Sequence, residues 1–406
     1  MSPCSLHGPP QFDENRGADE IVSATIGPAP ALLRLRTFVV ELALPFWATA
    51  GFDPAGRCFH ECLAFSGEPV RDEPRRLMVQ ARQVVVYSRA LLAGWSKCGE
   101  DLVWQAFESA RRRYRSPDGN PGWIFSVDPV GRPQDVTRDL YTHAFVIYML
   151  AWLYRLDANG SLLSLAESTL SEIDLIFSHG PGAGFLSKVP GRKNLREQNP
   201  HMHLFEALLA LAEASKMERY LVRANEIVEL FDAALSDPAT GAVRELFGED
   251  WKTDWPAGKN VVEPGHQMEW AWLLREWERI SGTQASGRVG RLVAHATAYG
   301  IDMEKRLVRT QVRESGEIVG SGSRVWPQTE AIRALSREDP KGHIWPNLVN
   351  DITEGLFRSH LPSSLKGGWI DQVDQNGNPS VGHMPASTLY HLAGAAIDGA
   401  RSLGLE

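Results

Sequence analysis

The sequence repeats one pattern six times, and this repetition constrains the fold more than any other feature. Twelve stretches carry apolar residues at the i, i+3, i+4 and i+7 spacing of amphipathic helices. They cover residues 31–48, 71–94, 101–114, 137–156, 162–177, 194–215, 218–235, 261–280, 285–307, 325–335, 341–360 and 386–403. Short apolar segments that begin with glycine recur between them, and we predict that they form hairpins. These glycines are Gly56, Gly122, Gly184, Gly241, Gly316 and Gly368.

The glycines also give the length of the repeating unit. From Gly56 to Gly368 the steps average about 62 residues, which fits two helices and a hairpin per unit. Helical repeats of this length either stack as an open solenoid or close into a ring. Six pairs of helices favour closure, so we predict an all-α fold. It is an (α/α)6 barrel with short β-hairpin loops at one end; an irregular helical domain is the alternative.

The first residues lack this helical pattern. Residues 1–28 contain several prolines and acidic residues and no periodic apolar residues, so we predict a flexible leader followed by a single barrel domain over residues 29–406. No stretch of about 18 uncharged apolar residues occurs, and no basic-then-apolar signal peptide begins the chain. We therefore expect a cytoplasmic protein.

The charge of the chain limits its partners. It has 42 Lys and Arg against 50 Asp and Glu, a net charge of −8, so it lacks the basic surface that binds nucleic acid or an anionic membrane. We expect a monomer or homodimer that acts on a small molecule, with no nucleic-acid or membrane partner.

The four cysteines do not predict a disulfide framework or a metal site. They are too few for such a framework in 406 residues. Cys58 and Cys62 flank His60, but a second pair of ligands, which a structural zinc requires, is missing. We expect reduced thiols and no metal.

The segment EPGHQMEWAW, residues 263–272, holds the most informative pair of polar residues. Pro-Gly before a helical run predicts a helix start, so His266 lies in the first turn and Glu269 follows one turn later on the same face. The helix dipole disfavours a charged imidazole and the carboxylate favours it, so we predict that His266 stays near neutrality and can act as acid or base. A surface capping arrangement is the alternative.

The segment NPHMHLFE, residues 199–206, starts another predicted helix. His201 and His203 lie about 200° apart on a helix, so only one of them faces inward. His203 shares its face with Glu206, and the Asn199 side chain is either a cap or a ligand. A capped helix with a core histidine explains the same pattern.

The last such segment is GHMPASTLYH, residues 382–391. Pro385 followed by serine and threonine predicts a helix start, which places His391 in the last helix and His383 in the preceding loop. The spacing does not choose between these two histidines.

Two further segments are weaker signals. Arg82 is surrounded by valines, and a buried arginine needs a partner. Glu330 follows Trp326 and Pro327 at a helix start, where it can also simply complement the helix dipole.

The motifs together, in their order along the chain, resemble the N-acylglucosamine 2-epimerase superfamily. They are MVQARQVVVYS, QNPHMHLFEALLALAEAS, EPGHQMEWAWLL, RVWPQTEAIRAL and the closing LYH. The resemblance extends from about residue 31 to the end and implies an (α/α)6 catalytic barrel without a cofactor. Members interconvert sugars by aldose–ketose isomerisation or C2 epimerisation. EPGHQMEW with GHMPASTLYH is most similar to the D-mannose isomerase branch, which converts mannose into fructose.

The resemblance also implies roles for individual residues. His266 and His391, not His383, match the acid/base pair, and Glu269 matches the glutamate after the first histidine. The positions implied to contact the sugar are Arg82, Tyr141, Asn199, His203, Trp326 and Glu330. His143 matches an inner-helix motif together with Tyr141. No metal is implied.

These residues suit proton abstraction beside a carbonyl. We expect His391 to move a proton between C2 and C1 of the open sugar through a cis-enediolate stabilised by Arg82. His266, oriented by Glu269, is expected to assist ring opening. A 2-epimerase, which returns the proton to the other face of C2, fits the same histidines. More distant alternatives are an (α/α)6 glycoside hydrolase that uses Glu269 and Glu330 and a non-catalytic sugar-binding module.

Overall fold

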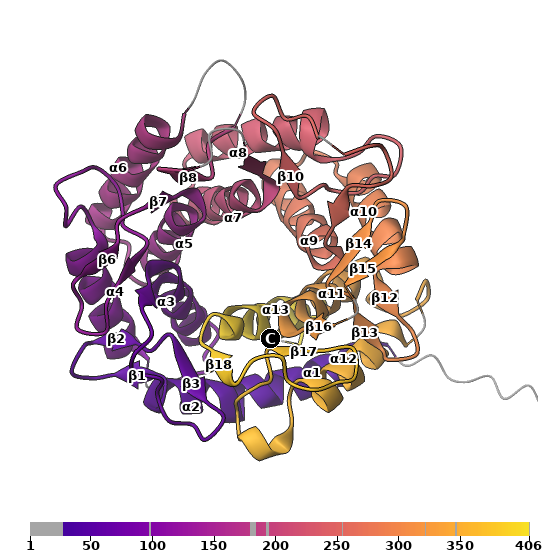
Figure 1. Ribbon diagram of the computed structural model, residues 1–406, viewed down its shortest axis with the longest axis horizontal. Helices are drawn as coiled ribbons and strands as arrows, with labels where there is room; N and C mark the ends of the chain where they lie inside the picture. Colours follow the sequence, from indigo (N-terminus) through magenta and orange to yellow (C-terminus); the bar gives the residue numbers. More distant parts are fainter. Residues whose placement is uncertain are drawn as a thin grey trace, which may run out of the picture.

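The computed structural model describes residues 27–96, 99–178, 184–191, 195–253, 255–320, 322–345 and 347–405. In these ranges the chain forms two concentric rings of helices, the predicted (α/α)6 barrel (Figure 1). The predicted leader falls almost entirely on residues outside the described ranges, as does Cys98. No described helix is long and apolar enough to cross a membrane.

The inner ring consists of six helices that are buried on nearly every face. They are α3 (Leu77–Leu92), α5 (Leu140–Leu156), α7 (Gln198–Ser215), α9 (Pro264–Ser281), α11 (Val325–Glu338) and α13 (Thr388–Ser402). Helix α5 shows the pattern best, because every residue from Thr142 to Leu153 is buried. Apolar residues around a whole helix are typical of a helix surrounded by others.

The outer ring covers this inner ring with amphipathic helices. It comprises α1 (Ala29–Thr37) continued by α2 (Leu44–Thr49), α4 (Glu100–Tyr114), α6 (Gly160–Phe177), α8 (Glu218–Leu230), α10 (Ser286–Tyr299) and α12 (Leu348–Ser359). A π-helical turn, Phe38–Ala43, joins α1 to α2, and another, Phe231–Leu235, ends α8. The twelve predicted helices are thus present.

Short antiparallel strand pairs tie each inner helix to its outer partner. A strand before the inner helix pairs with a strand after the outer helix of the same unit. The pairs are β4 (Arg75–Arg76) with β5 (Ser126–Val127), β7 (Arg138–Asp139) with β8 (Lys188–Val189), β9 (Arg196–Glu197) with β10 (Leu246–Phe247), β11 (Val261–Val262) with β14 (Gln311–Arg313), β16 (Ser323–Arg324) with β17 (Gln372–Val373), and β18 (His383–Pro385) with β3 (Cys62–Ala64). The last pair joins opposite ends of the chain and closes the ring. All inner helices therefore begin at the same end of the barrel.

The remaining strands extend this end of the barrel. Strands β1 (Phe52–Asp53) and β2 (Cys58–Phe59) form a hairpin, as do β12 (Ile301–Asp302) and β13 (Leu307–Val308). Strands β6 (Pro133–Asp135) and β15 (Ile318–Gly320) each add a third strand to a ladder. The hairpin loops predicted at one end of the barrel are confirmed.

Several predicted helix ends are wrong for one physical reason. The helices predicted to start at residues 71, 137 and 261 start later, because the residues just before each helix pair as strands. The helix predicted over residues 285–307 ends at Tyr299, since residues 301–308 form the β12–β13 hairpin. Its turn has Arg306 at φ 55° in place of a glycine, whereas Gly316 lies in the next hairpin, β14–β15.

The fourth residue of five inner helices holds a neighbouring hairpin in place. Gln80, Gln267 and Gln328 each exchange two hydrogen bonds with one backbone residue. His143 and His201 each form one such bond: Nε2 accepts from a backbone N–H of the neighbouring segment, and Nδ1 donates to the carbonyl of the residue just before its own helix. Burial lowers the pKa of both histidines to about 4. These neutral histidines hold the fold together and do not line the cavity described below.

Candidate active site

The first turns of the inner helices place one layer of six side chains around the barrel axis. They are Arg82, Phe145, His203, Glu269, Glu330 and His391. Contacts run around the layer. The Arg82 guanidinium lies 4.3 Å from the Phe145 ring centre, whose ring lies 4.7 Å from that of His203. Nε2 of His203 lies 3.9 Å from Oε1 of Glu269. A carboxylate oxygen of Glu269, one of Glu330 and a ring nitrogen of His391 lie within 4.8 Å of one another.

A cavity of about 490 Å³ lies against this layer, on the side of the strand pairs. Eight of the nine predicted site residues line it: His266, His391, Glu269, Arg82, Asn199, His203, Trp326 and Tyr141. The ninth, Glu330, lies behind His391 and bonds to it. His383 pairs within β18 and does not line the cavity. A set of residues spread over more than 300 positions is thus brought to one site.

His391 has one nitrogen free for chemistry. Its Nδ1 lies 2.8 Å from Oε1 of Glu330, whose other oxygen lies 3.3 Å from Arg333. A carboxylate only accepts hydrogen bonds, so Nδ1–H donates and Nε2 keeps its lone pair. Burial, together with the positive charges of Arg82 and His203, holds the pKa of His391 well below its usual range. At neutral pH this side chain is therefore an uncharged base.

His266 differs from the prediction in both its partner and its charge. Its Nδ1 lies 2.9 Å from Oε2 of Glu245 and 3.6 Å from Glu263, so Glu269 does not orient it. Burial lowers its pKa, but the charges of Glu245 and Glu263 outweigh this and raise the pKa of His266 to about 10. The expectation that His266 stays near neutrality is wrong, because Glu245 from the preceding unit and Glu263, three residues before His266, stabilise the imidazolium.

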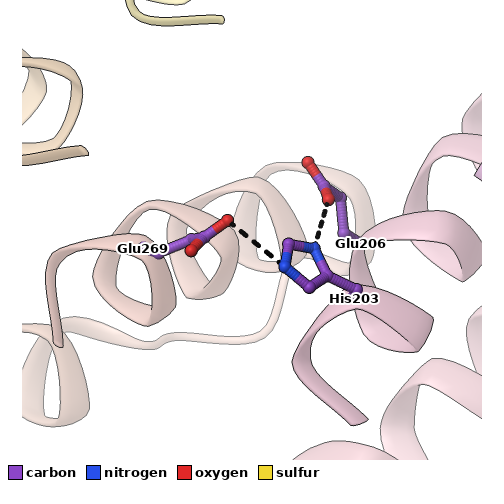
Figure 2. Close-up of side chains that lie close together, drawn as sticks. All are labelled: His203, Glu206 and Glu269. Atoms are coloured by element: carbon purple, nitrogen blue, oxygen red, sulfur yellow. Dashed lines mark hydrogen bonds and ion pairs between the residues drawn. The ribbon is translucent and has the colours of Figure 1, made fainter. Parts of the chain in front are cut away.

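Glu269 faces His203 instead (Figure 2). His203 Nδ1 donates to Oε2 of Glu206 at 3.0 Å, and Glu206 also accepts from Tyr390 at 2.6 Å. Burial raises the pKa of Glu206, but the bond and charge of His203, the charge of Arg333 and the bond from Tyr390 together outweigh this and lower the pKa to about 2. Glu206 is thus ionised, while His203 presents Nε2 to Glu269. His203, and not His201, is the inward histidine of its pair.

Glu269 carries an unused hydrogen-bonding atom. Its Oε1 is buried without a hydrogen-bond partner, and 3.9 Å from His203 is too long for such a bond. Burial, with the nearby charges of Glu330 and Glu206, raises the pKa of Glu269 well above its usual range. A sugar hydroxyl between these two groups can bond to both, since a hydroxyl both donates and accepts.

Two overlapping groups could hold a metal ion by proximity. They are His203, Glu206 and Glu269, and Glu269, Glu330 and His391. In each group the histidine Nδ1 already donates to a carboxylate. An ion that used those carboxylates would compete with these hydrogen bonds, which makes sugar hydroxyls the better fit to the unused atoms of this layer.

Arg82 is the cation of the layer that lacks an anionic partner. Its guanidinium donates to the Tyr141 hydroxyl at 2.5 Å and lies over the rings of Phe145 and Tyr390. It is 5% exposed, and its Nε has no hydrogen-bond partner. The sequence predicts a partner for this buried arginine, and the partners found are one hydroxyl and two aromatic rings. None of them neutralises the positive charge, so Arg82 can stabilise a negatively charged oxygen of a ligand.

Trp326 and Asn199 complete the predicted set. The Trp326 ring lies 4.8 Å from His266 and 5.9 Å from His391 between ring centres. It packs on Gly265, where a Cβ would come within 2.4 Å of the indole. Asn199 does not cap α7, and its Oδ1 is buried without a partner. Of the two roles considered for Asn199, only that of a ligand to a bound molecule fits.

Other cavity residues were not predicted from the sequence. They include Glu197, Glu245, Glu263, Gln311, Arg324, Asp371 and Thr388. Most of these lie on or beside the short strands, which carry no periodic pattern. Glu263 is part of the motif EPGH, so it is the residue of this set that the sequence could have indicated.

Comparison with known proteins identifies the family. The family described as N-acylglucosamine 2-epimerase (GlcNAc 2-epimerase) matches residues 58–395, most of the chain. The chain belongs to this family. It is a carbohydrate isomerase or epimerase, as its sequence motifs predicted.

Individual relatives cover nearly the whole chain. A mannose-6-phosphate isomerase from Rhizobium meliloti (strain 1021) is 32% identical over 373 residues, 87% of this chain and 92% of that protein. A D-mannose isomerase from Marinomonas mediterranea is 27% identical, over 90% and 96% of the two chains. A cellobiose 2-epimerase from Bacteroides fragilis is 23% identical, over 82% and 89%. The likeness to the mannose isomerase branch is confirmed.

Solved structures agree on the fold. A D-mannose isomerase crystal structure superposes with a TM-score of 0.81 at 22% identity, covering 92% of this chain and 97% of that one. At this identity the match supports the barrel architecture and nothing finer.

Proposed function

We propose that this enzyme interconverts D-mannose and D-fructose through a cis-enediolate. The proposal is carried by one observation: two histidines line the same cavity, and each has its Nδ1 held by a carboxylate, so that Nε2 remains for a substrate. The pKa of His391 is lowered well below its usual range and the pKa of His266 is raised to about 10. A neutral base and a charged acid therefore coexist at neutral pH, and the ring of Trp326 lies 5.9 Å from the first and 4.8 Å from the second between ring centres.

The reaction follows from these protonation states. Nε2 of His391 takes the proton from C2 of open-chain mannose, the C–H electron pair forms the C1=C2 bond, and the carbonyl electrons move to O1. Arg82 and protonated His266 stabilise the negative charge that develops on the oxygens. His391 then returns its proton to C1, and the O2 proton passes to O1, which leaves the C2 ketone and the C1 hydroxyl of fructose. Before this, in ring opening, His266 can donate a proton to the ring oxygen and recover one from the O1 hydroxyl, so that it is protonated again for the next step.

The charge around the cavity favours an unphosphorylated sugar. Five carboxylates line it: Glu197, Glu245, Glu263, Glu269 and Asp371. The cationic side chains of lysine and arginine in the described lining are Arg82, deep in the site, and Arg324, which pairs with Asp371 at 3.2 Å. A phosphate dianion would meet this negative surface without a free arginine at the mouth.

We therefore expect D-mannose to be a better substrate than D-mannose 6-phosphate, even though one relative is named for the phosphorylated sugar. The ratio of kcat/KM should be at least about tenfold in favour of mannose, which corresponds to about 1.4 kcal/mol of unfavourable electrostatics. Initial rates with both sugars at low and high salt measure it. A preference for the phosphate, strongest at low salt, would contradict the proposed substrate.

Proton NMR with D-mannose in heavy water tests the reaction itself. We expect fructose as the first product, with deuterium incorporated at C1 or C2 where the enediolate exchanges with solvent. Glucose as the first product would replace the proposal with a 2-epimerase, the alternative that uses the same two histidines.

The glycoside hydrolase alternative is the weaker one on geometry. It needs two carboxyl groups across a scissile bond, and Glu269 and Glu330 were the candidates. Glu330 is bonded to His391 and Arg333, behind the surface of the cavity. Of these two candidates, only Glu269 lines the cavity.

A further inference from the structure

Glu245 occupies a position that no sequence motif marks. It lies immediately before β10, in the unit that precedes α9, and its carboxylate reaches the start of α9. Oε1 accepts from the backbone N–H of Glu263 at 3.1 Å, and Oε2 lies 2.9 Å from Nδ1 of His266. One carboxylate thus holds both the entry into α9 and the histidine of its first turn.

The neighbouring amide fixes the direction of these hydrogen bonds. The Trp270 indole N–H, which can only donate, bonds to Oε1 of Gln198 at 2.7 Å. The Gln198 Nε2 group is therefore turned toward Oε2 of Glu245, to which it donates at 2.9 Å. Nε2 of Gln198 also lies 3.0 Å from His266 Nδ1. Because the Glu245 carboxylate only accepts and lies 2.9 Å from Nδ1, Nδ1 carries the proton and donates to Glu245, and the Gln198 amide donates to Glu245 and not to the ring.

We propose that Glu245 is the positioning residue that makes His266 the proton donor of this site. Glu245 holds Nδ1–H, so the other ring nitrogen, Nε2, is directed to the cavity, and the carboxylate charge keeps that nitrogen protonated. The inference rests on the proposed function for the use of this proton, and adds a division of labour between the two histidines. His391, buried beside Arg82, stays a base, whereas Glu245 makes His266 an acid.

Other charged groups also face His266, and one of them, Glu263, provides the control substitution. Glu263 lies 3.6 Å from Nδ1, beyond hydrogen-bond distance, and its Oε1 accepts from Gln311 at 2.9 Å. Glu269 contributes a weaker favourable charge from the same helix, and protonated His203 on α7 would oppose it. Glu245 is the carboxylate among these that is hydrogen-bonded to the ring, so its removal should change His266 most.

The experiment compares Glu245→Gln with Glu263→Gln and with the conservative Glu245→Asp. Imidazole NMR of the sugar-free protein, with the His266 signals assigned from a His266→Asn variant, follows the titration without any turnover. We expect wild-type His266 to stay protonated through neutral pH. In Glu245→Gln its midpoint should fall by at least about one pH unit, with a smaller fall in Glu263→Gln and partial restoration in Glu245→Asp.

The pH profile of kcat/KM, which reports the titrating groups of the sugar-free enzyme, gives the second readout. The active form has His266 protonated, so activity is lost as pH rises through the pKa of His266. The alkaline limb should therefore move to lower pH in Glu245→Gln by the same amount as the NMR midpoint, with the acidic limb in place. An unchanged His266 midpoint in Glu245→Gln, or a shifted midpoint with an unmoved alkaline limb, overturns the proposal. If wild-type protein does not turn over mannose, the proposed function fails, while the NMR titration still decides whether Glu245 controls His266.

Discussion

Replacing His391 by asparagine is expected to lower kcat for mannose about 10²- to 10⁴-fold, the usual contribution of a general base. The loss should appear in kcat more than in KM, because the proton is taken only in the transition state. Exchange of the C2 proton of mannose with heavy water should fall in parallel. Rates of mannose turnover and of exchange, measured on the same protein, check both parts.

His383 provides a matched control for this substitution. It lies eight residues earlier in the same motif, on β18, and outside the cavity lining. His383→Asn should keep kcat within about twofold, since surface substitutions away from the site change little. If His391→Asn retained wild-type exchange of the C2 proton, the assignment of the base would be wrong and His266 would be the next candidate.

The barrel could be predicted because its signal is local and repeated. Apolar spacing within each helix, and the recurrence of helix pairs, required no knowledge of distant contacts. The strand pairs could not be predicted, because most of their strands are two residues long and pair with residues about 50 positions away, as Arg76 does with Ser126. Their residues were therefore assigned to the following helices, and the starts of α3, α5 and α9 were placed too early.

The site was predictable to the same extent. Residues in the early turns of inner helices meet at one opening, so His266 and Glu269 could be assigned to one site from the helix start alone. The choice of His391 over His383 came from the family resemblance. The partner of His266 could not be predicted, because Glu245 belongs to another unit and lies 21 residues earlier in the chain. The i, i+3 neighbour expected to orient His266, Glu269, is directed to His203 on the adjacent helix. Contacts between units decide orientation and charge, and a single sequence does not display them.

The second large effect is expected for Arg82→Met, which should lower kcat about 10²- to 10³-fold, as the loss of one donor to a developing oxyanion does. Methionine keeps an unbranched, flexible side chain in the buried site and removes the charge. KM should change less, because the enediolate bears the charge that Arg82 stabilises, whereas mannose is neutral. Arg82→Lys should recover part of kcat, since lysine keeps the charge but lacks the planar donor group. Steady-state kinetics of the two variants measure this difference.

Tyr141→Phe separates the arginine's charge from its placement. It removes the hydroxyl that accepts from Arg82 at 2.5 Å and keeps the aromatic ring, so we expect kcat to fall by less than about tenfold.

A comparison with Arg333 explains why the larger effect is expected for Arg82. It is also buried, but Glu330 and Asp398 bind it at 3.3 and 2.7 Å, so its charge is already neutralised. Arg82 has no carboxylate within salt-bridge distance among the described residues. Its positive charge is therefore available to the negative charge that forms when mannose loses its C2 proton. An Arg82→Met enzyme with kcat within threefold of wild type would contradict this role and require another cation for the enediolate.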